Sequence, residues 1–493
     1  MTLMNADRAM LEEEIRLAAQ SEEKGNLEDM FEGVRRAFAI DPYCYELFYM
    51  LGIYYLEKNG AKAMLSLERA KNLALSDEYA QEADHRLIEE TMEIAGKRAD
   101  SRVNPVSIVI VSYNDREYME QCLDVIRQEQ RLSPGQIEVI VVDNASTDGV
   151  TDFLKSRDDI RLIINEENLG FSAGCNIGYE AAGEGRDIFL LNNDAILTPN
   201  AFFWLRIGLY DSIDTGAVSA VSNNATTQMA DFMDVLGMPA VQNETEEQRR
   251  PFDVFLRRAH KINIPMRNPY EERARLTGFA VLIKADAAAN VLAEDVSGSG
   301  RKQLMDERYS PAYFEDDDLG MRLAQAGYRQ LLCHNSFIYH YGGKGFFGHQ
   351  DLMMRSRKLF IQKWGFDIWD YELASVKPLL MIGDDRKKPL RVLEVGCGMG
   401  VTLSAIKYRY PFAYVAGIEK SASVAALGRH LADILVGDVM TMNLPFAAHS
   451  FDYIIVSEMD APACDSYGKD SYADNIDRRL REYLRPDGII LYD

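Results

Sequence analysis

Two β-branched runs set the architecture of the central part of this chain: residues 106–112 read VSIVIVS and residues 137–143 read IEVIVVD. Between them, residues 116–130 carry apolar side chains at the three- and four-residue spacing of an amphipathic helix. Strand, helix and strand in this order predict two parallel strands joined by a crossover helix. The alternation continues with RLIIN at 161–165 and DIFLL at 187–191, so the sequence predicts an α/β domain built on a parallel sheet.

Polar residues follow these predicted strands at their carboxyl ends, which is where open α/β sheets bind ligands. Residues 112–114 (SYN) follow the first strand, residues 143–148 (DNASTD) the second and residues 192–194 (NND) the fourth. Carboxylates gathered there without arginines to balance them repel one another unless they bind hydrogen-bond donors or a cation. The pattern therefore predicts a divalent metal at this edge of the sheet.

The length and composition of the chain limit the kinds of protein it can be. Its 493 residues are too many for one ordinary domain and, at ~150 residues per domain, predict about three. With 47% hydrophobic and 27% charged residues the composition is globular, unlike that of disordered, collagen-like or disulfide-scaffold chains. A formal net charge of −23 gives no overall attraction for phosphate polymers, so we expect no nucleic-acid partner.

The sequence also bears on location and on the state of the cysteines. No stretch approaches the ~18 uninterrupted apolar residues of a membrane span, and residues 1–10 (MTLMNADRAM) lack the basic-then-apolar order of a signal peptide. We therefore expect no transmembrane segment and a cytoplasmic protein, or one held peripherally at the inner face of the membrane. The 6 cysteines have no C-x-x-C spacing, which predicts reduced thiols rather than a zinc site or a disulfide framework.

Residues 1–100 carry almost no β signal and read as a set of short amphipathic helices. They resemble tetratricopeptide repeats over roughly one and a half copies, because small residues and a closing proline fall where that repeat places them. The matching residues are Ala18, Gly25, Ala37 and Pro42 in one copy and Phe48, Leu51, Gly52, Tyr55, Ala63 and Ala70 in the next. Two interpretations stay open: a helical cap packed on its neighbour, or a module that presents a groove to a protein partner.

Six motifs in the central part of the chain occur in the order typical of one enzyme family. They are SIVIVSYN (107–114), VVDNASTDG (141–149), NLGFSAGCNIG (168–178), LLNNDA (190–195), TGFAVLIK (277–284) and YFEDDDLGMRLAQAGYR (313–329), with HYGG following at 340–343. Residues 105–345 thereby resemble the family 2 glycosyltransferases of the GT-A fold, particularly the branch that includes bacterial rhamnosyltransferases. The resemblance implies an inverting transfer of a sugar from a UDP-, GDP- or dTDP-sugar to a hydroxyl acceptor.

The same resemblance implies a donor pocket at the ends of the first two strands. Asp143 would hold the base or ribose, because a carboxylate accepts hydrogen bonds from ring N–H groups and ribose hydroxyls. Asn114 and Ser146 would line the same pocket. The other candidate donor-binding residues are Ser112, Asn176 and Asn193 at the strand ends, and Lys344, in the glycine-rich stretch 342–348, as a contact to the donor phosphates.

For the metal, the resemblance points to two residues far apart in the sequence. Residues 192–194 occupy the place of the family's D-x-D motif, but the first of them is Asn192, so Asp194 would carry most of the metal contact. A hard oxygen ligand suits Mg²⁺ or Mn²⁺. His340 matches the family's late metal-binding histidine, and a nitrogen ligand tilts the choice towards Mn²⁺. A hydrogen-bonded core histidine is the alternative interpretation of His340.

The acidic cluster EDDD at 315–318 holds the candidate base. By resemblance, Asp316 accepts the proton of the acceptor hydroxyl as that oxygen attacks the anomeric carbon. A solvated acidic helix start, which the helix dipole favours, is the alternative interpretation. We expect the polar, turn-rich interval 222–275 to face the acceptor, but a fold-level resemblance leaves a glycan, a lipid-linked glycan and a protein Ser or Thr all open as acceptors.

A basic stretch at 385–389 precedes the pattern of a second α/β domain. Residues 390–400 (LRVLEVGCGMG) read as a strand running into a G-x-G-x-G turn, and residues 414–419 (YVAGIE) as a strand that ends in an acid. This region resembles class I S-adenosylmethionine-dependent methyltransferases and implies that cofactor, with Glu419 on its ribose and Asp438 near its adenine. The candidate cofactor-binding residues are Glu394, Gly396, Gly398, Gly400, Glu419 and Asp438.

The sequence thus predicts an α/β protein in three parts: an all-α helical-repeat domain at 1–100, a GT-A glycosyltransferase core at 104–375 and a Rossmann-like, partial methyltransferase-like domain at 386–493. Asp493 follows the predicted fifth strand of the last part directly, so we expect either a chain that is cut short or a reduced domain. Two other functions stay open. One is a methyltransferase acting on a glycan that the central part recognises, and the other is a scaffold without catalysis built around the helical repeats.

Overall fold

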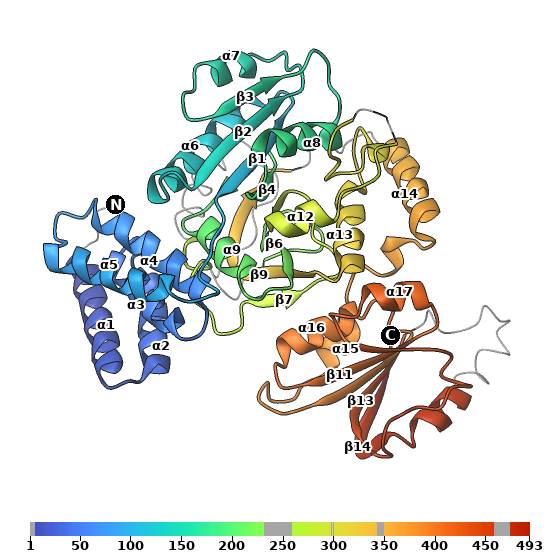
Figure 1. Ribbon diagram of the computed structural model, residues 1–493. Coiled ribbons are helices and arrows are strands. Elements are labelled where there is room, and N and C mark those ends of the chain that lie inside the picture. The colour runs from blue at the N-terminus through green and yellow to red at the C-terminus, as the bar shows by residue number, and fades with distance from the viewer. Residues whose placement is uncertain (1–4, 231–258, 297, 299, 343–349, 458–473) are drawn as a thin grey trace. The chain divides into compact units, whose positions relative to one another are not determined.

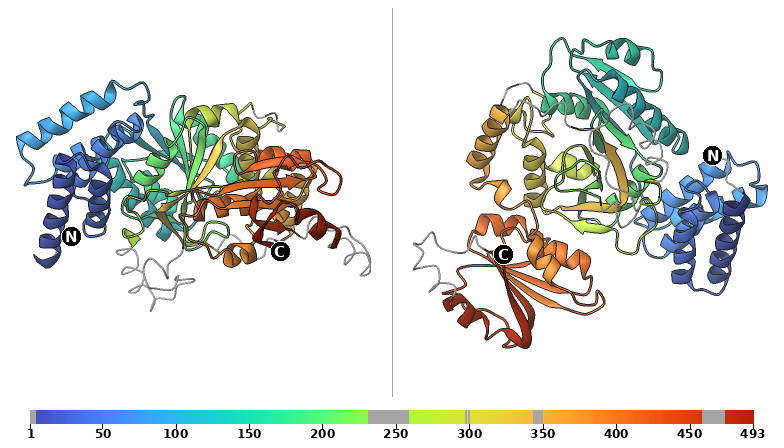
Figure 2. Two further views of the ribbon diagram at one scale, coloured as in Figure 1. Left: turned by 90° about the horizontal axis from the view of Figure 1, so that it is seen from below. Right: turned by 180° about the vertical axis from the view of Figure 1, so that it is seen from behind.

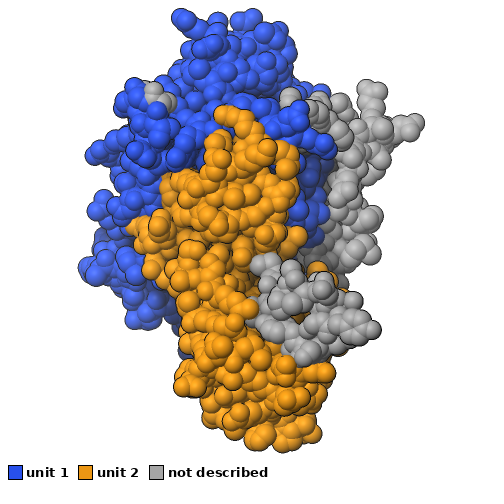
Figure 3. Space-filling model, turned by 90° about the vertical axis from the view of Figure 1, so that its right-hand side faces the viewer, with its two compact units in different colours: residues 1–269, 277–316, 332–353 blue, residues 270–276, 317–331, 354–493 orange. Residues whose placement is uncertain are grey.

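The computed structural model describes residues 5–230, 259–296, 298, 300–342, 350–457 and 474–493. The chain forms two compact units, coloured separately in Figure 3. Residues 1–269, 277–316 and 332–353 make up unit 1, and residues 270–276, 317–331 and 354–493 make up unit 2. The first unit joins the amino-terminal helices to most of the central sheet.

The amino-terminal part of unit 1 is entirely helical, as the sequence predicts. Its helices are α1 (Asn5–Glu23), α2 (Leu27–Phe38), α3 (Tyr45–Leu56), α4 (Gly60–Ala74) and α5 (Glu82–Gly96). Local sequence explains the break between the first two helices, since Gly25 takes a positive φ of 72° and the side chain of Asn26 caps α2 by accepting from the backbone N–H of Asp29. Figures 1 and 2 show these helices gathered at one end of the unit.

These helices pack on helices of the central part of unit 1, and buried aromatic rings make much of the contact. Phe38 and Phe48 lie against Trp204 and Phe203 of α9 (Ala201–Leu209), with ring centroids 6.0 and 5.1 Å apart. A buried ion pair joins Arg69 of α4 to Glu129 of α6 (Arg116–Leu132) at 2.6 Å. This is the packing of a helical cap on its neighbour.

The central sheet has the strand order β3-β2-β1-β4-β8-β6-β9-β5, and β7 pairs with β9. Its strands are β1 (Val106–Ser112), β2 (Ile137–Asp143), β3 (Arg161–Ile164), β4 (Asp187–Leu191), β5 (Ala195–Leu197), β6 (Thr215–Val221), β7 (Tyr270–Glu272), β8 (Ala280–Ile283) and β9 (Arg329–His340). β1 runs parallel to β2 and β4, and β2 runs parallel to β3, whereas β8 is antiparallel to β4 and β6. The predicted parallel α/β core is confirmed, with an antiparallel extension beyond β4.

Two glycines bring α8 (Phe171–Ala182) close enough to the sheet to shape its carboxyl edge. A Cβ atom on Gly178 would lie 2.2 Å from Cγ1 of Val109, and one on Gly174 would lie 2.8 Å from Cγ1 of Val111. Because no side chain fits at these positions, the helix rests directly on β1 and its first turn lies beside the strand ends. Further helices among the described residues of the central region are α7 (Val150–Lys155), α12 (Ala285–Asn290), α13 (Glu315–Ala326) and α14 (Gln350–Trp364).

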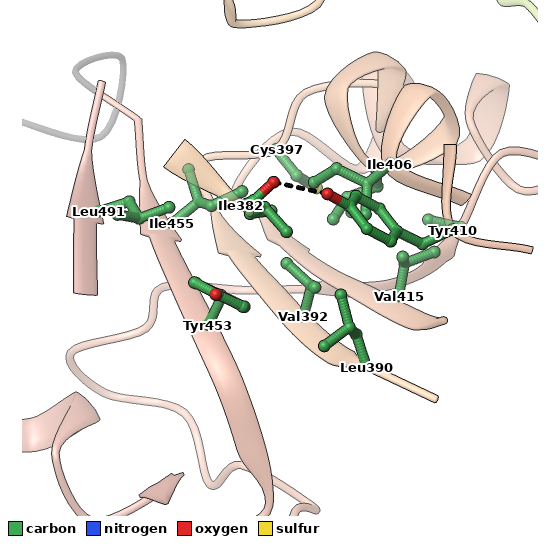
Figure 4. Packing of buried hydrophobic residues seen from close by; sticks show 12 residues of the cluster. Ile382, Leu390, Val392, Cys397, Ile406, Tyr410, Val415, Tyr453, Ile455 and Leu491 are labelled. Atoms are coloured by element: carbon green, nitrogen blue, oxygen red, sulfur yellow. Dashed lines mark hydrogen bonds between the residues drawn. The ribbon is translucent and has the colours of Figure 1, made fainter. Parts of the chain in front are cut away.

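Unit 2 contains a second sheet, parallel throughout, with the strand order β12-β11-β10-β13-β14. Its strands are β10 (Arg391–Val395), β11 (Tyr414–Glu419), β12 (Asp433–Val436), β13 (Phe451–Val456) and β14 (Leu484–Tyr492), with helices α15 (Val376–Met381), α16 (Val401–Arg409) and α17 (Ala422–Leu427). Figure 4 shows the core on one face of this sheet, where the hydroxyl of Tyr410 donates to the carbonyl of Ile382 at 2.5 Å. The predicted Rossmann-like carboxyl-terminal part is confirmed.

Within the described ranges, no helix combines the length and the apolar composition that a membrane crossing requires.

Candidate active site

The ends of β1 and β2 form a turn held together by its own hydroxyls. Ser112 and Asp143 are paired in the parallel register, and Asp143 has an exposed fraction of 0%. One carboxylate oxygen of Asp143 accepts from Oγ of Ser146 at 2.5 Å and the other accepts from Oγ1 of Thr151 at 2.6 Å. Ser146 in turn accepts from the backbone N–H of Asn114 at 2.8 Å. The predicted donor-binding residues Asn114, Asp143 and Ser146 are therefore brought together, with Asp143 at the inner side of the turn.

A cavity of about 550 Å³ opens beside this turn. Asn114, with a positive φ of 63°, accepts from the backbone N–H of Thr147 at 2.8 Å, while Asp148 accepts from the backbone N–H of Arg116 at 2.9 Å. The residues that line the cavity come from the start of α6 and from the turn after β2: Asn114, Asp115, Arg116, Glu117, Tyr118, Thr147 and Asp148. Of these, only Asn114 was singled out from the sequence, although Asp148 stands in the VVDNASTDG motif that contains Asp143 and Ser146.

Three further residues predicted to bind the donor lie in different surroundings. Asn193 is at the turn, with its amide nitrogen 3.5 Å from the carbonyl of Asn114. The hydroxyl of Ser112 is buried and has no hydrogen-bond partner in the described part of the chain. Asn176 is buried and exchanges hydrogen bonds of 2.8 Å with both the carbonyl and the N–H of Met305, which ties α8 to the segment before α13.

Asp194 and His340 meet, as the sequence predicts, although 146 positions of sequence separate them. β5 begins directly after Asp194 and pairs antiparallel with β9, which places Ala195 opposite His340. Oδ1 of Asp194 lies 3.3 Å from Nε2 of His340, and Oδ2 accepts from the backbone N–H of Gly342 at 2.9 Å. Burial lowers the pKa of His340, but the hydrogen bond and charge of Asp194 outweigh that effect, so this pKa lies above its usual value.

The hydrogen bonds of His340 leave one ring nitrogen suited to a metal. Nδ1 lies 2.7 Å from the carbonyl oxygen of Asn224, and a carbonyl only accepts, so in the neutral ring Nδ1 carries the hydrogen. Nε2 then has its lone pair on the side of Asp194. Histidines that bind metals usually donate their other ring N–H in this way. The pair thus fits a divalent cation, with one nitrogen and one carboxylate ligand.

Among the residues that the structure describes, no group of three or more His, Cys, Asp or Glu side chains is arranged to hold a metal ion. A cation bound by Asp194 and His340 would also accept oxygen ligands from a bound molecule or from water. Mg²⁺ and Mn²⁺ at nucleotide sites share their coordination with substrate phosphates in this way. Lys344, the candidate phosphate contact, lies outside the described residues.

Gly278 and Phe279, the two residues before β8, connect Asp316 to the candidate metal-binding pair of Asp194 and His340. Its Oδ2 accepts from the backbone N–H of Gly278 at 2.8 Å. The next residue, Phe279, stacks its ring on that of His340 with centroids 5.0 Å apart, and its carbonyl accepts from the N–H of Asn192 at 2.8 Å. The candidate base, Asp316, thus contacts Gly278, and the candidate metal ligand, His340, contacts the next residue, Phe279.

The acidic cluster around Asp316 is not a solvated helix start. Asp317 and Asp318 are buried, and within unit 2 they pair with Arg275 at 2.8 Å and Lys363 at 2.5 Å. Asp316 itself is only partly buried. The residues just before the cluster, Tyr313 and Phe314, adopt positive φ angles of 76° and 69°, a conformation that is costly for bulky side chains and that recurs at functional sites.

In unit 2 the glycine-rich turn meets Glu419, the last residue of β11. Gly396, Gly398 and Gly400 all have positive φ, and the backbone N–H of Gly398 donates to Glu419 at 2.9 Å. The other oxygen of Glu419 accepts from the N–H of Ser421 at 2.7 Å. Asp438 accepts from the N–H of Met440 at 2.8 Å, at the end of β12.

A cavity of about 340 Å³ adjoins the turn, and one wall of it is a buried acid, Glu394. One oxygen of Glu394 accepts from Ser457 at 3.0 Å, while the other is buried with no hydrogen-bond partner within the described residues. Burial raises the pKa of Glu394 to about 8. The described residues that line the cavity include the acids Asp370, Glu394 and Asp493 and, among them, no Lys or Arg, so this lining suits a ligand that donates hydrogen bonds or carries positive charge.

Two family models match separate parts of the chain. Residues 107–222 match "Glycosyl transferase family 2", and residues 392–488 match "Methyltransferase domain". The first range contains the turn after β2 and Asp194, and the second contains the glycine-rich turn, Glu419 and Asp438.

Curated relatives match over the first of these regions. The chain is 32% identical over 123 residues to glycosyltransferase AglE of Haloferax volcanii, covering 24% of this chain and 38% of that protein. It is 27% identical over 170 residues to the teichoic acid poly(glycerol phosphate) polymerase of Staphylococcus epidermidis, covering 34% of this chain and 22% of that protein. The chain therefore spans well under half the length of these relatives.

Solved structures show weaker likeness. GalNAc-T7 with UDP, GalNAc and Mn²⁺ aligns with a TM-score of 0.38 and 13% identity, over 55% of this chain and 50% of that one. Mannosyltransferase PcManGT of Pyrobaculum calidifontis, in complex with GDP-Man and Mn²⁺, aligns with a TM-score of 0.34 and 16% identity, over 77% of this chain and 88% of that one. These scores are too low to carry an argument. What the comparisons show is therefore a match of residues 107–222 to the model of glycosyl transferase family 2 and of residues 392–488 to that of a methyltransferase domain.

Proposed function

We propose that the central part of the chain is an inverting, metal-dependent glycosyltransferase that moves a sugar from a nucleotide-sugar donor to a hydroxyl acceptor. The observation that carries the proposal is the joint placement of three side chains. Asp194 and His340 lie 3.3 Å apart, and Asp316 is held by the residue that precedes the ring stacked on His340. A cation-binding pair beside a partly buried carboxylate is what this reaction requires.

The donor would lie along the carboxyl edge of the sheet. Its base and ribose would occupy the cavity beside Asn114 and Asp148, with the hydroxyl of Ser112 as a further polar contact. Its diphosphate would reach the side of Asp194 and His340, where a bound Mn²⁺ or Mg²⁺ would supply charge neutralisation for the leaving nucleotide. Lys344 would add a positive contact to the phosphates.

Asp316 would act as the general base. The N–H of Gly278 fixes one of its carboxylate oxygens, which orients the group without neutralising it. The carboxylate would accept the proton of the acceptor hydroxyl while that oxygen attacks the anomeric carbon from the side opposite the nucleotide. This geometry inverts the anomeric configuration.

For the acceptor and the donor sugar, we propose only their chemical class. Relatives named for glycosyl transfer and for teichoic acid polymerisation favour an acceptor that is part of a glycan or a lipid-linked polymer, with protein Ser or Thr as the alternative. Rhamnose is the donor sugar suggested by the resembled branch, and UDP, GDP and dTDP remain the nucleotides to compare. The amino-terminal helices would offer a surface to a protein partner, and the reaction would take place in the cytoplasm or at the inner face of the membrane.

A screen tests this function directly. A panel of UDP-, GDP- and dTDP-sugars is incubated with the full chain, with and without Mn²⁺, and nucleotide release is measured. We expect Mn²⁺-dependent release with at least one donor, stimulated by a hydroxyl acceptor. If the wild-type chain neither binds Mn²⁺ with a nucleotide nor releases nucleotide from any donor, the proposal fails and the scaffold function is favoured.

A second function, S-adenosylmethionine binding by residues 392–488, is favoured by one specific observation. Within the described residues, one oxygen of Glu394 has no hydrogen-bond partner and the cavity lining holds no Lys or Arg, which fits the amino group of that cofactor, while Glu419 would meet the ribose and Asp438 the adenine. The cofactor, when bound, would supply an electrophilic methyl group. Titration calorimetry with S-adenosylmethionine tests binding, and no heat at millimolar ligand would contradict it. Methylation of a glycan without nucleotide release would favour the alternative in which the central part serves recognition.

A further inference from the structure

The segment at residues 222–230, directly after β6, folds into a closed loop. The backbone N–H of Ser222 donates to the carbonyl of Gln228 at 2.8 Å, and the N–H of Ala230 donates to the carbonyl of Ser222 at 2.8 Å. A third bond of 2.8 Å, from the N–H of Gln228 to the carbonyl of Ala225, closes the inner turn. From the sequence, this segment is the start of the polar interval 222–275 that we expect to face the acceptor, and no individual residue of it was given a role.

Near its start, this loop forms hydrogen bonds to β9, the strand that ends in the candidate metal ligand His340. Asn223 is 2% exposed, and its amide accepts from the backbone N–H of His340 at 2.9 Å while donating to the carbonyl of His340 at 3.1 Å. Asn224 accepts from the imidazole at its carbonyl and donates from its side chain to the carbonyl of Tyr341 at 3.1 Å. The side-chain amide of Asn223 thus fixes the backbone of His340, and the backbone carbonyl of Asn224 fixes its ring.

Near its end, the loop forms hydrogen bonds to the segment at residues 277–278, which holds the candidate base Asp316. Gln228 is 1% exposed and anchors its amide nitrogen to Oγ of Ser219 and to the carbonyl of Ala220, both at 2.8 Å. Its carbonyl oxygen accepts from the backbone N–H of Thr277 at 2.6 Å. The next N–H along the chain, that of Gly278, is the one that donates to Asp316.

We infer that the loop 222–230 positions both halves of the catalytic centre, with Asn223 acting on His340 and Gln228 acting on Asp316 through residues 277–278. This inference rests on the proposed glycosyl transfer. The two amides are positioning residues, because each acts through another residue. Both are buried and saturated with hydrogen bonds, so their removal leaves backbone groups unsatisfied in a low-dielectric environment and lets those groups shift.

The two ends of the loop act on different steps, which makes their effects separable. Loss of the amide at 223 loosens His340 and should weaken the binding of Mn²⁺ and of the donor. Loss of the amide at 228 loosens Thr277 and Gly278 and should slow the step that needs Asp316, with donor binding retained. A purely structural loop would instead lower stability alone.

The experiment compares Asn223→Ala and Gln228→Ala with a matched control, Asn263→Ala. Asn263 is also a fully buried amide, and it donates to Thr198 and Pro199 and accepts from Phe337, three residues before His340 on β9, all at 2.7 Å. Three quantities are measured on the full chain: Mn²⁺ affinity by electron paramagnetic resonance, KM and kcat for the donor, and the melting temperature. Asn223→Ser and Gln228→Met, which keep more of the lost volume, replace either alanine variant that does not fold.

We expect Asn223→Ala to weaken Mn²⁺ binding and raise the donor KM by ~10-fold or more, the scale of a lost outer-shell partner. Gln228→Ala should lower kcat by ~10-fold or more with Mn²⁺ affinity unchanged, since a small misplacement of a catalytic group is sufficient for such a loss. Asn263→Ala should lower the melting temperature to a similar extent and move neither quantity.

Two results overturn the inference in different ways. If the wild-type chain binds Mn²⁺ and releases nucleotide, but the variants at 223 and 228 lose only stability like Asn263→Ala, the positioning role is wrong and the proposed function stands. If the wild-type chain neither binds Mn²⁺ nor releases nucleotide, the proposed function fails first and the positioning role fails with it.

Discussion

The ring of Phe279 stacks on the imidazole of His340, with centroids 5.0 Å apart and planes inclined by 24°. This contact matters because the residue before Phe279 donates to Asp316 and the residue paired with His340 is Asp194. A flat aromatic face holds the imidazole in one plane, the side-chain amide of Asn223 holds its backbone, and the backbone carbonyl of Asn224 holds its ring nitrogen. The candidate base and the candidate metal pair are therefore parts of one packed arrangement rather than separate polar sites.

Replacing the candidate base should stop turnover while leaving the donor site intact. In Asp316→Asn the amide keeps the size of the side chain but cannot take a proton, so we expect kcat to fall by ~10²-fold or more, the scale of a lost general base. Nucleotide binding, measured by calorimetry, should stay near the wild-type value. Asp158→Asn, a change at a side chain that is 88% exposed, is the control, and near-normal turnover in Asp316→Asn would remove this residue from the mechanism.

Removing the candidate metal carboxylate should act on binding instead. Asp194→Ala leaves His340 without its partner at 3.3 Å and frees the N–H of Gly342. We expect Mn²⁺-dependent nucleotide binding to disappear, because a single imidazole is a weak site for a hard cation. Calorimetry with and without Mn²⁺ measures the effect. Equal binding in the two conditions for the wild-type chain would show that the pair holds no metal.

Glu394 should make the stability of unit 2 depend on pH. Burial raises its pKa from 4.5 to about 8, so the folded state retains a proton that the unfolded chain releases. The resulting stabilisation is complete below about pH 4.5 and is lost as the pH rises towards 8. Glu394→Gln, which stays neutral, should match the wild-type melting temperature at low pH and exceed it at pH values above 8. Parallel melting curves at every pH would contradict the burial of this carboxyl.

The ion pair between the helical part and the central part of unit 1 should be costly to break from one side. The side chains of Arg69 and Glu129 are 3% and 6% exposed, so Arg69→Ala leaves a carboxylate buried without its partner. We expect a loss of about 3–5 kcal/mol in the free energy of unfolding, measured with urea. Arg8→Ala, which breaks a pair whose side chains are 55% and 66% exposed, should leave the free energy of unfolding nearly unchanged, because water screens that pair.

The strands of the central core were predictable because their physical signal is local. β1 and β2 cover the residues predicted for them, 106–112 and 137–143, since a buried parallel strand reads as a continuous β-branched run. β6 (TGAVSAV) was not identified, because small residues and serines dilute the pattern of a strand.

In the candidate site, only residues that lie in family motifs could be predicted from the sequence. Asp194, His340 and Asp316 were identified from family motifs, and the structure brings the first two together and joins the third to them. The loop 222–230 was missed, because Asn223 and Gln228 look like ordinary loop residues until their partners, 117 and 49 positions away, are known. Asn176 is the opposite case: it was selected as a donor-binding residue because it lies in a family motif, but its side chain is buried and bonds to Met305.

The turn after β2 is tied by bonds from Ser146 and Thr151 to Asp143 and from the N–H of Asn114 to Ser146. A pocket wall assembled from the chain's own hydroxyls is rigid before any ligand arrives, so an incoming nucleotide would order little new backbone and lose little entropy there. Association at this wall should accordingly be fast and limited by encounter rather than by refolding of the loop.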